Sequence, residues 1–191
     1  MNPITHLLVG WAVAEAAPGA DRRSRALITW ASVIPDLDGL GMPVELLTRD
    51  SHTPLLWFTE YHHVLCHNIG FALLVTGAAA LFAKSKRGLT AALVALSFHL
   101  HLLGDLVGAR GPDGEQWPIP YLRPFSKAWD LTWAHQWPLN GWQNISLTLA
   151  LLGLAFRLAW RRGHSPVELF SSTAERGFMA ALYRRFPKRV I

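Results

Sequence analysis

The sequence is poor in cysteine and in charge. Its 191 residues include one cysteine, Cys66, which excludes an internal disulfide framework and leaves packing or metal binding to stabilise the fold. Only 16% of the residues are charged, below the roughly 25% usual for soluble globular domains. The N-terminus lacks a basic segment, and Thr5 and His6 interrupt its apolar run, so we expect no cleavable signal peptide.

Apolar and aromatic residues are abundant instead. Half of the chain is hydrophobic and nine residues are tryptophan, a composition typical of membrane proteins. The length suits one membrane-embedded helical domain over residues 1–191, with no repeat or linker to divide it. Residues 163–191 read as a basic amphipathic tail with a helix at 173–186, preceded by a short helix that Ser165 and Pro166 begin.

The helical pattern begins with Asn2 and Pro3, a capping residue followed by a proline at the first helical position. It predicts helices at 4–17 and 26–34, which form a short N-terminal hairpin. Longer apolar runs at 69–83, 89–107 and 143–160 lie at or just below the roughly 17–25 residues needed to cross a bilayer. The predicted fold is therefore an all-α, multi-pass membrane bundle with three spanning helices plus the N-terminal hairpin.

The connecting segments carry further expectations. A short helix is predicted near 44–47, and the Gly-, Pro- and Trp-rich stretch 108–141 is expected to form an ordered cap. If residues 36–39 are extended, Asp36 and Asp38 point to one side.

Most basic residues fall on one side of the predicted bundle. If the helices run up and down, the turns at 22–25 and 84–87 and the tail after residue 155 share that side, with fourteen of the eighteen Lys and Arg residues. Such an excess marks the cytoplasmic face, so we predict that the basic loops and the C-terminus lie inside. A soluble bundle with one basic end is the alternative. The tail up to Arg189 could also bind nucleic acid, but anionic lipid headgroups are the simpler partner for a basic segment beside a membrane helix.

Histidine and aspartate define the candidate site. His101 and Asp105 lie one helical turn apart on one face of a helix and can bind one ion. Without other candidate ligands, the pair would be interpreted as a core histidine beside a helix-end carboxylate. His99 points to the opposite side and is expected to hydrogen-bond a neighbouring helix. The same alternation brings candidate ligands from four stretches of chain to the side opposite the basic residues. This set suits zinc or another divalent metal, as one or two ions: His6, Asp36, Asp38, His62, His63, His67, His101 and Asp105.

Three histidines within six residues leave two ligand pairs open. His62 and His67 share a metal only if a helix begins between them, whereas His63 and His67, four apart, fit one helix face. Cys66 reads either as a thiolate ligand or as a buried inert thiol. The remaining histidines, at 52, 135 and 164, read as ordinary polar residues.

Four motifs in order resemble the YdjM-like predicted inner-membrane metal-dependent hydrolases and, more distantly, the zinc-dependent phospholipase C and nuclease group. They are Thr5-His6, Pro35-Asp36-Leu37-Asp38, His62-x4-His67 and His101-x3-Asp105, within residues 1–126. The resemblance implies that the metal ligands are His6, Asp36, Asp38, His62, His67, His101 and Asp105. The chain departs from the family pattern at His63, Cys66 and Asn68, where Arg, Thr and Ser are usual.

The resemblance and the ligand set together predict a membrane-bound hydrolase. The expected substrate is a phosphoester, lipid phosphoesters included, attacked by a metal-activated water that Asp36 or Asp38 orients. The tryptophan-rich segment 117–142 is expected to line the entry. The alternative is a non-catalytic protein in which the metal is structural or transported. Transport is disfavoured, because all candidate ligands gather near one end of the bundle and none lies at mid-span.

Overall fold

Side-chain caps set where the first helices begin. In the computed structural model, which describes residues 1–188, the side chain of Asn2 accepts a hydrogen bond from the amide of Thr5 at 2.9 Å and opens α1 (Pro3–Glu15). Asp21 accepts likewise from the amide of Ser24 at 2.9 Å and opens α2 (Arg22–Trp30). The two helices pack as the predicted hairpin, and Gly10 permits their close approach.

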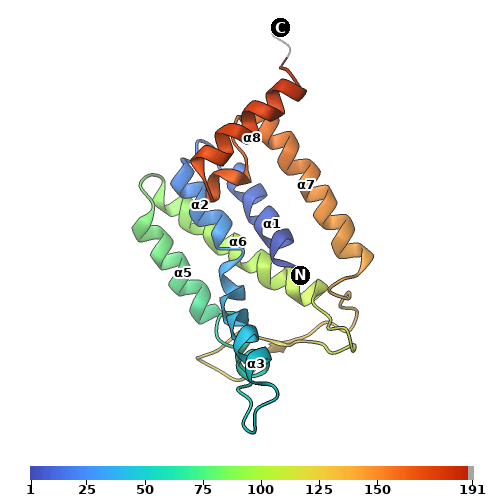
Figure 1. The fold of residues 1–191 in the computed structure, drawn as a ribbon. Helices are drawn as coiled ribbons and strands as arrows, with labels where there is room; N and C mark the ends of the chain where they lie inside the picture. Colours follow the sequence, from blue (N-terminus) through green and yellow to red (C-terminus); the bar gives the residue numbers. More distant parts are fainter. Residues whose placement is uncertain (189–191) are drawn as a thin grey trace.

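A central helix organises the rest of the bundle. This helix, α6 (Arg87–Gly108), packs against α5 (Ile69–Phe82), α2 and α1, with Val94 and Phe98 fully buried (Figure 1). Helix α7 (Trp142–Arg162) covers the other side of α1, and α8 (Ser172–Arg185) returns against the end of α7 after the short turn η2 (Pro166–Leu169). The all-α class is confirmed.

The number of clear membrane spans differs from the prediction. Among the described residues, α6 is the one helix that is both long and apolar enough to cross a membrane. Helix α5 has only 14 residues. Helix α7 has 21 residues, but Gln143 and Asn144 at its start and Arg157 near its end reduce its apolar stretch. The expectation of three such helices is therefore wrong.

Residues 34–68 form short helices and turns, and residues 36–39 are not extended. The stretch with both aspartates is a 3₁₀ helix, η1 (Ile34–Gly41), followed by α3 (Met42–Thr48) and α4 (Trp57–Tyr61). In a 3₁₀ helix, side chains two positions apart point in different directions, unlike those of a strand. Asp36 and Asp38 consequently face different partners.

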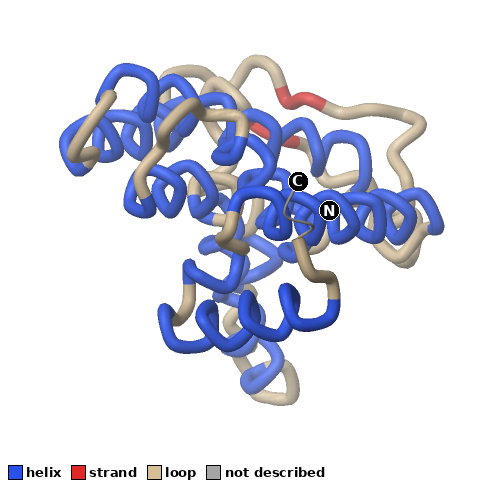
Figure 2. Tube along the Cα trace, turned by 90° about the horizontal axis from the view of Figure 1, so that it is seen from above, coloured by secondary structure: helices blue, strands red, loops and turns tan. Residues whose placement is uncertain are grey.

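The stretch after α6 is an ordered cap, as expected. Its two short strands, β1 (Ile119–Pro120) and β2 (Asp130–Leu131), pair antiparallel and appear as the red segments of Figure 2. Ile119 is buried against Phe98, and the carbonyl of Tyr121 accepts a hydrogen bond from the amide of Ile69 at 2.8 Å. These contacts fix the cap over the ends of α5 and α6.

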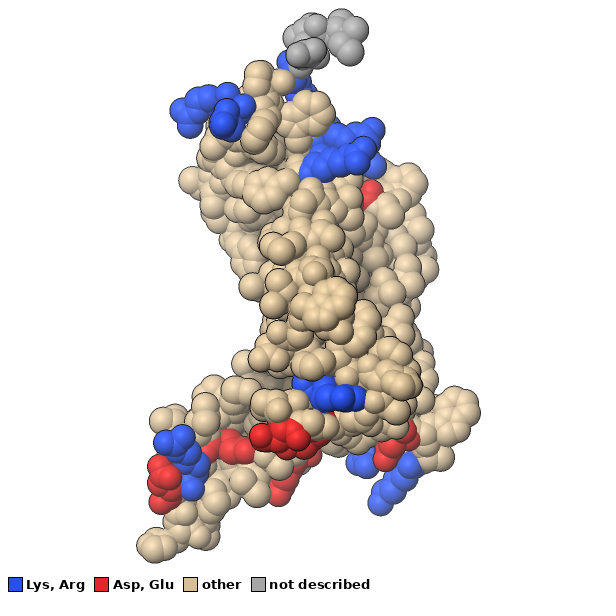
Figure 3. Space-filling view, turned by 90° about the vertical axis from the view of Figure 1, so that its right-hand side faces the viewer, with Lys and Arg blue, Asp and Glu red and all other residues tan. Residues whose placement is uncertain are grey.

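The two ends of the bundle differ in charge. Ser85 bonds Asp21 and Arg25 bonds Glu168, so the α1–α2 turn, the α5–α6 turn and η2 share one end with α8, which we call the basic end. On the face shown in Figure 3, Lys and Arg gather at that end, a band without charge follows, and most Asp and Glu lie beyond it. Residues 34–68 and 109–141 form the opposite, loop end. Arg189, expected among the basic residues, lies outside the described residues.

Candidate metal centre

Four side chains from three parts of the chain meet inside the bundle. Asp36 comes from η1, His67 from the turn before α5, and His101 and Asp105 from one face of α6. One ligand atom from each lies within 4.8 Å of all the others. The i, i+4 spacing on α6 thus supplies half of the group, as the sequence predicts.

The distances centre on Nε2 of His101. This atom lies 2.9 Å from Oδ2 of Asp105, 3.1 Å from Nε2 of His67 and 3.7 Å from Oδ1 of Asp36. Nε2 of His67 is 3.5 Å from Oδ2 of Asp105. Three of the side chains are buried, whereas that of Asp36 is 21% exposed.

Hydrogen bonds at the far side of each ring determine which nitrogen is free. Nδ1 of His101 donates to the carbonyl of Ser32 at 2.9 Å, and Nδ1 of His67 donates to Oδ2 of Asp38 at 3.1 Å. In the neutral rings, Nε2 of both histidines therefore carries a lone pair aimed at the common centre. This arrangement is typical of metal-binding histidines, whose second nitrogen is held by a carbonyl or carboxylate.

The carboxylates also direct unsatisfied oxygens inward. Oδ1 of Asp105 receives hydrogen bonds from Nε2 of His6, at 3.0 Å, and from the amino group of Met1. Within the described chain, Oδ2 of Asp105 and Oδ2 of Asp36 are buried and accept no hydrogen bond. Burying such acceptors is costly unless a cation compensates them. Two nitrogens and two carboxylates suit zinc or a similar divalent ion.

Asp38 and His62 lie one layer outside the four-residue group. Asp38 accepts from Nδ1 of His62 at 2.8 Å, from Nδ1 of His67 and from the amide of Cys66 at 3.0 Å. Although burial opposes the effect, these hydrogen bonds hold the pKa of Asp38 below its usual range. Both of its oxygens are thus engaged in orienting other side chains.

The group attracts positive charge. Burial alone would lower the pKa of His67, but Asp105 and Asp38 outweigh burial and raise it to about 9. Burial raises the pKa of Asp36.

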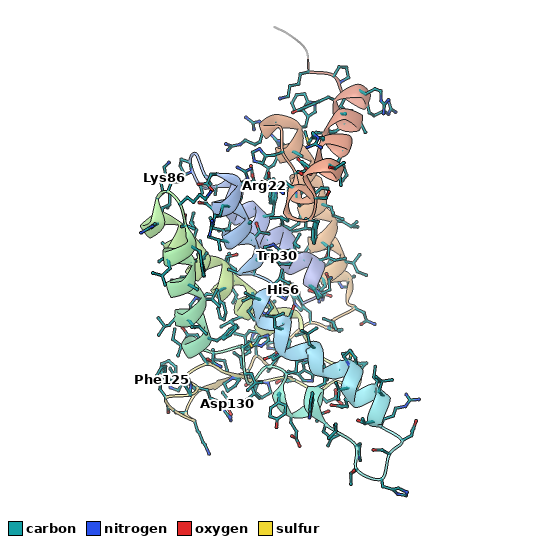
Figure 4. All side chains as sticks on the ribbon, turned by 60° about the vertical axis from the view of Figure 1, so that its left-hand side comes forward. His6, Arg22, Trp30, Lys86, Phe125 and Asp130 are labelled. Atoms are coloured by element: carbon teal, nitrogen blue, oxygen red, sulfur yellow. The ribbon has the colours of Figure 1, made fainter. Side chains whose placement is uncertain are left out.

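His6, which the sequence predicts as a ligand, lies outside the four-residue group. Its ring centroid is 3.9 Å from that of His101, and its Nε2 orients Asp105. Figure 4 shows His6 within the bundle, between Arg22 and Lys86 on one side and Phe125 and Asp130 on the other.

Residues 1–183 match the family described as YdjM inner membrane protein. The chain belongs to the YdjM family. The match includes all four residues of the group and confirms the resemblance to the YdjM family; it shows no similarity to metal-dependent hydrolases or to the phospholipase C group. No curated protein and no solved structure matches the chain.

At the loop end, this YdjM-family chain has a pocket of about 450 Å³, whose lining includes His62 and His63 and none of the four residues of the group. Phe58, His62, His63 and Trp117 are among the residues that line it. The tryptophan-rich segment is expected to line the entry to the site. Trp117 lines this pocket, whereas Trp129 and Trp142 lie outside it and are 66% and 72% exposed.

His63 connects the pocket to the ligand group. Its backbone is left-handed, with φ of 66°, and its ring stacks on that of His67 with centroids 4.2 Å apart. Nδ1 of His63 is buried without a hydrogen-bond partner among the described residues, and burial lowers the pKa of the ring. No helix begins between His62 and His67 and no helix carries His63, so neither helical pairing expected from the spacing forms.

The other singled-out residues have separate places. Burial, reinforced by Asp38, raises the pKa of Cys66 to about 11, which keeps it a thiol rather than a thiolate ligand. His99 donates to the carbonyl of Ala95 at 2.7 Å and accepts from the hydroxyl of Tyr121 at 2.9 Å. The sequence predicts a partner on a neighbouring helix, but Tyr121 lies in the cap. Sequence reasoning also missed the Ser32 carbonyl, because a backbone acceptor leaves no residue-type signal.

Proposed function

We propose that this YdjM-family protein is a membrane-bound hydrolase that uses a divalent metal, zinc by preference, to cleave a phosphoester. The observation that carries the proposal is the convergence of ligand atoms from Asp36, His67, His101 and Asp105 within 4.8 Å of one another, near a pocket that His62 and His63 line. When bound, such an ion supplies Lewis acidity, which activates water as a nucleophile and polarises a phosphoryl oxygen.

The residues divide into holding and orienting roles. His67, His101 and Asp105 would hold the ion from buried positions, and Asp36 is the member of the group that is partly exposed. Asp36 is therefore our choice for the carboxylate that orients water, whereas Asp38 acts as a positioning residue through His62 and His67. An exposed ligand favours a catalytic site, because structural sites are closed by protein ligands.

The pocket and its surroundings support a lipid phosphoester. A volume of about 450 Å³ accommodates a headgroup-sized molecule, and Phe58 and Trp117 supply aromatic walls. Nearby in the chain, Leu40, Leu46 and Leu47 expose 67%, 56% and 87% of their surface. Such exposed leucines are favourable in contact with a membrane interface, from which a lipid could reach the pocket.

We further propose that the basic end faces the cytoplasm and the metal site the opposite side of the inner membrane. The uncharged band in Figure 3 separates the basic end from the loop end, and an excess of Lys and Arg beside membrane helices marks the inside.

Metal content and hydrolysis of the purified protein test the function. We expect bound metal in the wild type and hydrolysis of a chromogenic phosphodiester or of phospholipid, both lost on chelation. Asp36→Asn should keep much of the metal and lose activity, and His101→Ala should lose both. His99→Ala is the matched control, because it removes a histidine of the same helix that bonds the cap instead of the site.

Two results would contradict the proposal. A wild type that holds no metal and is equally stable with chelator would remove the site. Metal binding without hydrolysis of soluble or lipid phosphodiesters would point to the alternative, a structural or transported metal.

A further inference from the structure

A second cavity lies at the basic end, far along the chain from the metal ligands. Helices α7 and α8 enclose a groove of about 820 Å³ whose walls include Phe156, Trp160 and Phe186. Two arginines, Arg157 and Arg185, also line it. The groove therefore joins an aromatic surface to two positive charges.

The groove is held in shape by packing and by hydrogen bonds. Ala159, Met179 and Leu182 form a small buried cluster between the two helices. The indole of Trp160 donates to the carbonyl of Phe186 at 2.8 Å, and the hydroxyl of Tyr183 donates to the carbonyl of Trp160 at 3.3 Å. These contacts fix the return of α8 along α7, so the groove exists before any ligand arrives.

The acidic residues of this end are committed elsewhere. Glu168 accepts from Arg25 at 2.8 and 2.9 Å, Glu15 from His164 at 2.7 Å, and Glu175 from the amide of Ser165 at 2.7 Å. Asp21 caps α2. Among the described residues, neither Arg157 nor Arg185 forms an ion pair with a carboxylate. The groove consequently has two arginines without a counter-charge in the described fold.

An apolar track leads from the groove along α7. Leu149, Leu152 and Phe156 follow each other at helical spacing on one face and expose 63%, 36% and 50% of their surface. Trp160 continues this face into the groove. A free phosphate would contact only the arginines, and nucleic acid would not contact a track of aliphatic side chains. The combination therefore favours a ligand with both a phosphate and an apolar chain.

We propose that this groove binds one anionic phospholipid. Arg157 and Arg185 contact the headgroup phosphate, Trp160 and Phe186 cover the glycerol region, and an acyl chain follows Phe156, Leu152 and Leu149. Arginine suits this task because its planar group pairs with two phosphate oxygens at once. The site is separate from the proposed hydrolase centre and stands without it.

Lipid binding by the full-length protein in a neutral detergent tests the site. The probes are tail-labelled phosphatidylglycerol and phosphatidylcholine, with affinity measured by fluorescence polarisation. We expect a preference for phosphatidylglycerol that Arg157→Gln with Arg185→Gln reduces roughly 10- to 30-fold. The matched control, Arg23→Gln with Lys84→Gln, removes the same charge from exposed positions of the same end and should leave the preference intact.

Further measurements distinguish a lipid from other ligands of the groove. Leu152→Gln, which changes no charge, should weaken binding of the lipid and not of its water-soluble headgroup. Equal losses in the double variant and its control would reduce the effect to bulk charge and overturn the site. Full competition by millimolar inorganic phosphate, or tighter binding of duplex DNA than of lipid, would also overturn it.

Discussion

At the residue scale, the two histidines of the candidate metal centre, His67 and His101, owe their orientation to acceptors behind them. Asp38 holds both His62 and His67, and its lowered pKa keeps it a carboxylate at neutral pH. Removing such an acceptor behind a metal ligand typically costs about 10- to 100-fold in metal affinity. We expect Asp38→Asn to weaken zinc binding by this factor, as measured by chelator competition. Asp130→Asn, an exposed change on β2, should leave the affinity unchanged.

The raised pKa of His67 makes metal binding depend on pH. With a pKa of about 9 in the metal-free protein, His67 is protonated at neutral pH, and an incoming ion must displace that proton. Zinc affinity should therefore fall about tenfold for each unit of pH below 9 and level off above it. Calorimetric titrations in buffers of different ionisation enthalpy should count about one proton released per ion at neutral pH. An affinity independent of pH between 7 and 8.5 would contradict this assignment.

The sequence identifies the ligand types but does not separate the ligands from the residues that support them. His101 and Asp105 are readable because helical spacing places them on one face. The division between Asp36 and Asp38 depends on the 3₁₀ turn of η1, and the roles of His62 and His63 depend on a left-handed backbone at His63. Neither conformation has a residue-type signature here, so the seven predicted positions could not be ranked from the sequence.

At the element scale, the approach of α1 to α2 supports the site. A Cβ at Gly10 would lie 2.1 Å from Oγ of Ser32 and 2.7 Å from the carbonyl of Thr29. The carbonyl of Ser32, just after α2, accepts a hydrogen bond from His101, so a displaced α2 also moves a residue of the candidate metal centre. We expect Gly10→Ala to lower the free energy of unfolding by about 1–3 kcal/mol and to weaken zinc binding. Thermal unfolding and chelator competition measure the two effects.

Gly77→Ala in α5 is the matched control for that change. Nothing lies within 4 Å of a Cβ at Gly77, and alanine favours a helix over glycine by about 0.5–1 kcal/mol. This variant should be as stable as the wild type or more stable. Equal destabilisation of both variants would show that the loss at Gly10 is unrelated to the contact with Ser32.

The helices themselves follow from local signals. Asn2 and Pro3, and Ser165 and Pro166, begin helical turns where their capping chemistry predicts. Long apolar runs give α5, α6 and α7 within a few residues. The pairing of β1 with β2 was not predicted, because two-residue strands inside a Pro-rich loop leave no alternating pattern.

At the scale of the whole molecule, the separation of charge predicts an orientation. Exposed Ser85 lies in the α5–α6 turn at the basic end, and exposed Asp113 lies in the cap at the loop end. In a Cys66→Ala background, single cysteines at these positions can be labelled in intact spheroplasts with a membrane-impermeant maleimide. We expect Asp113→Cys to react at once and Ser85→Cys to react only after the membrane is opened, because basic segments stay inside.

The same labelling also tests how a bundle with one clear spanning helix sits in a membrane. Helix α6 runs from the basic end to the cap, so its two ends must lie on opposite sides if it spans. Labelling of both cysteines in intact cells would mean that α6 is a buried core helix and that the protein lies on the membrane surface. The reverse pattern would place the metal site in the cytoplasm, where a headgroup would have to reach the pocket from the inner leaflet. Only the expected pattern combines a spanning α6 with a cytoplasmic basic end and a metal site on the opposite side of the membrane.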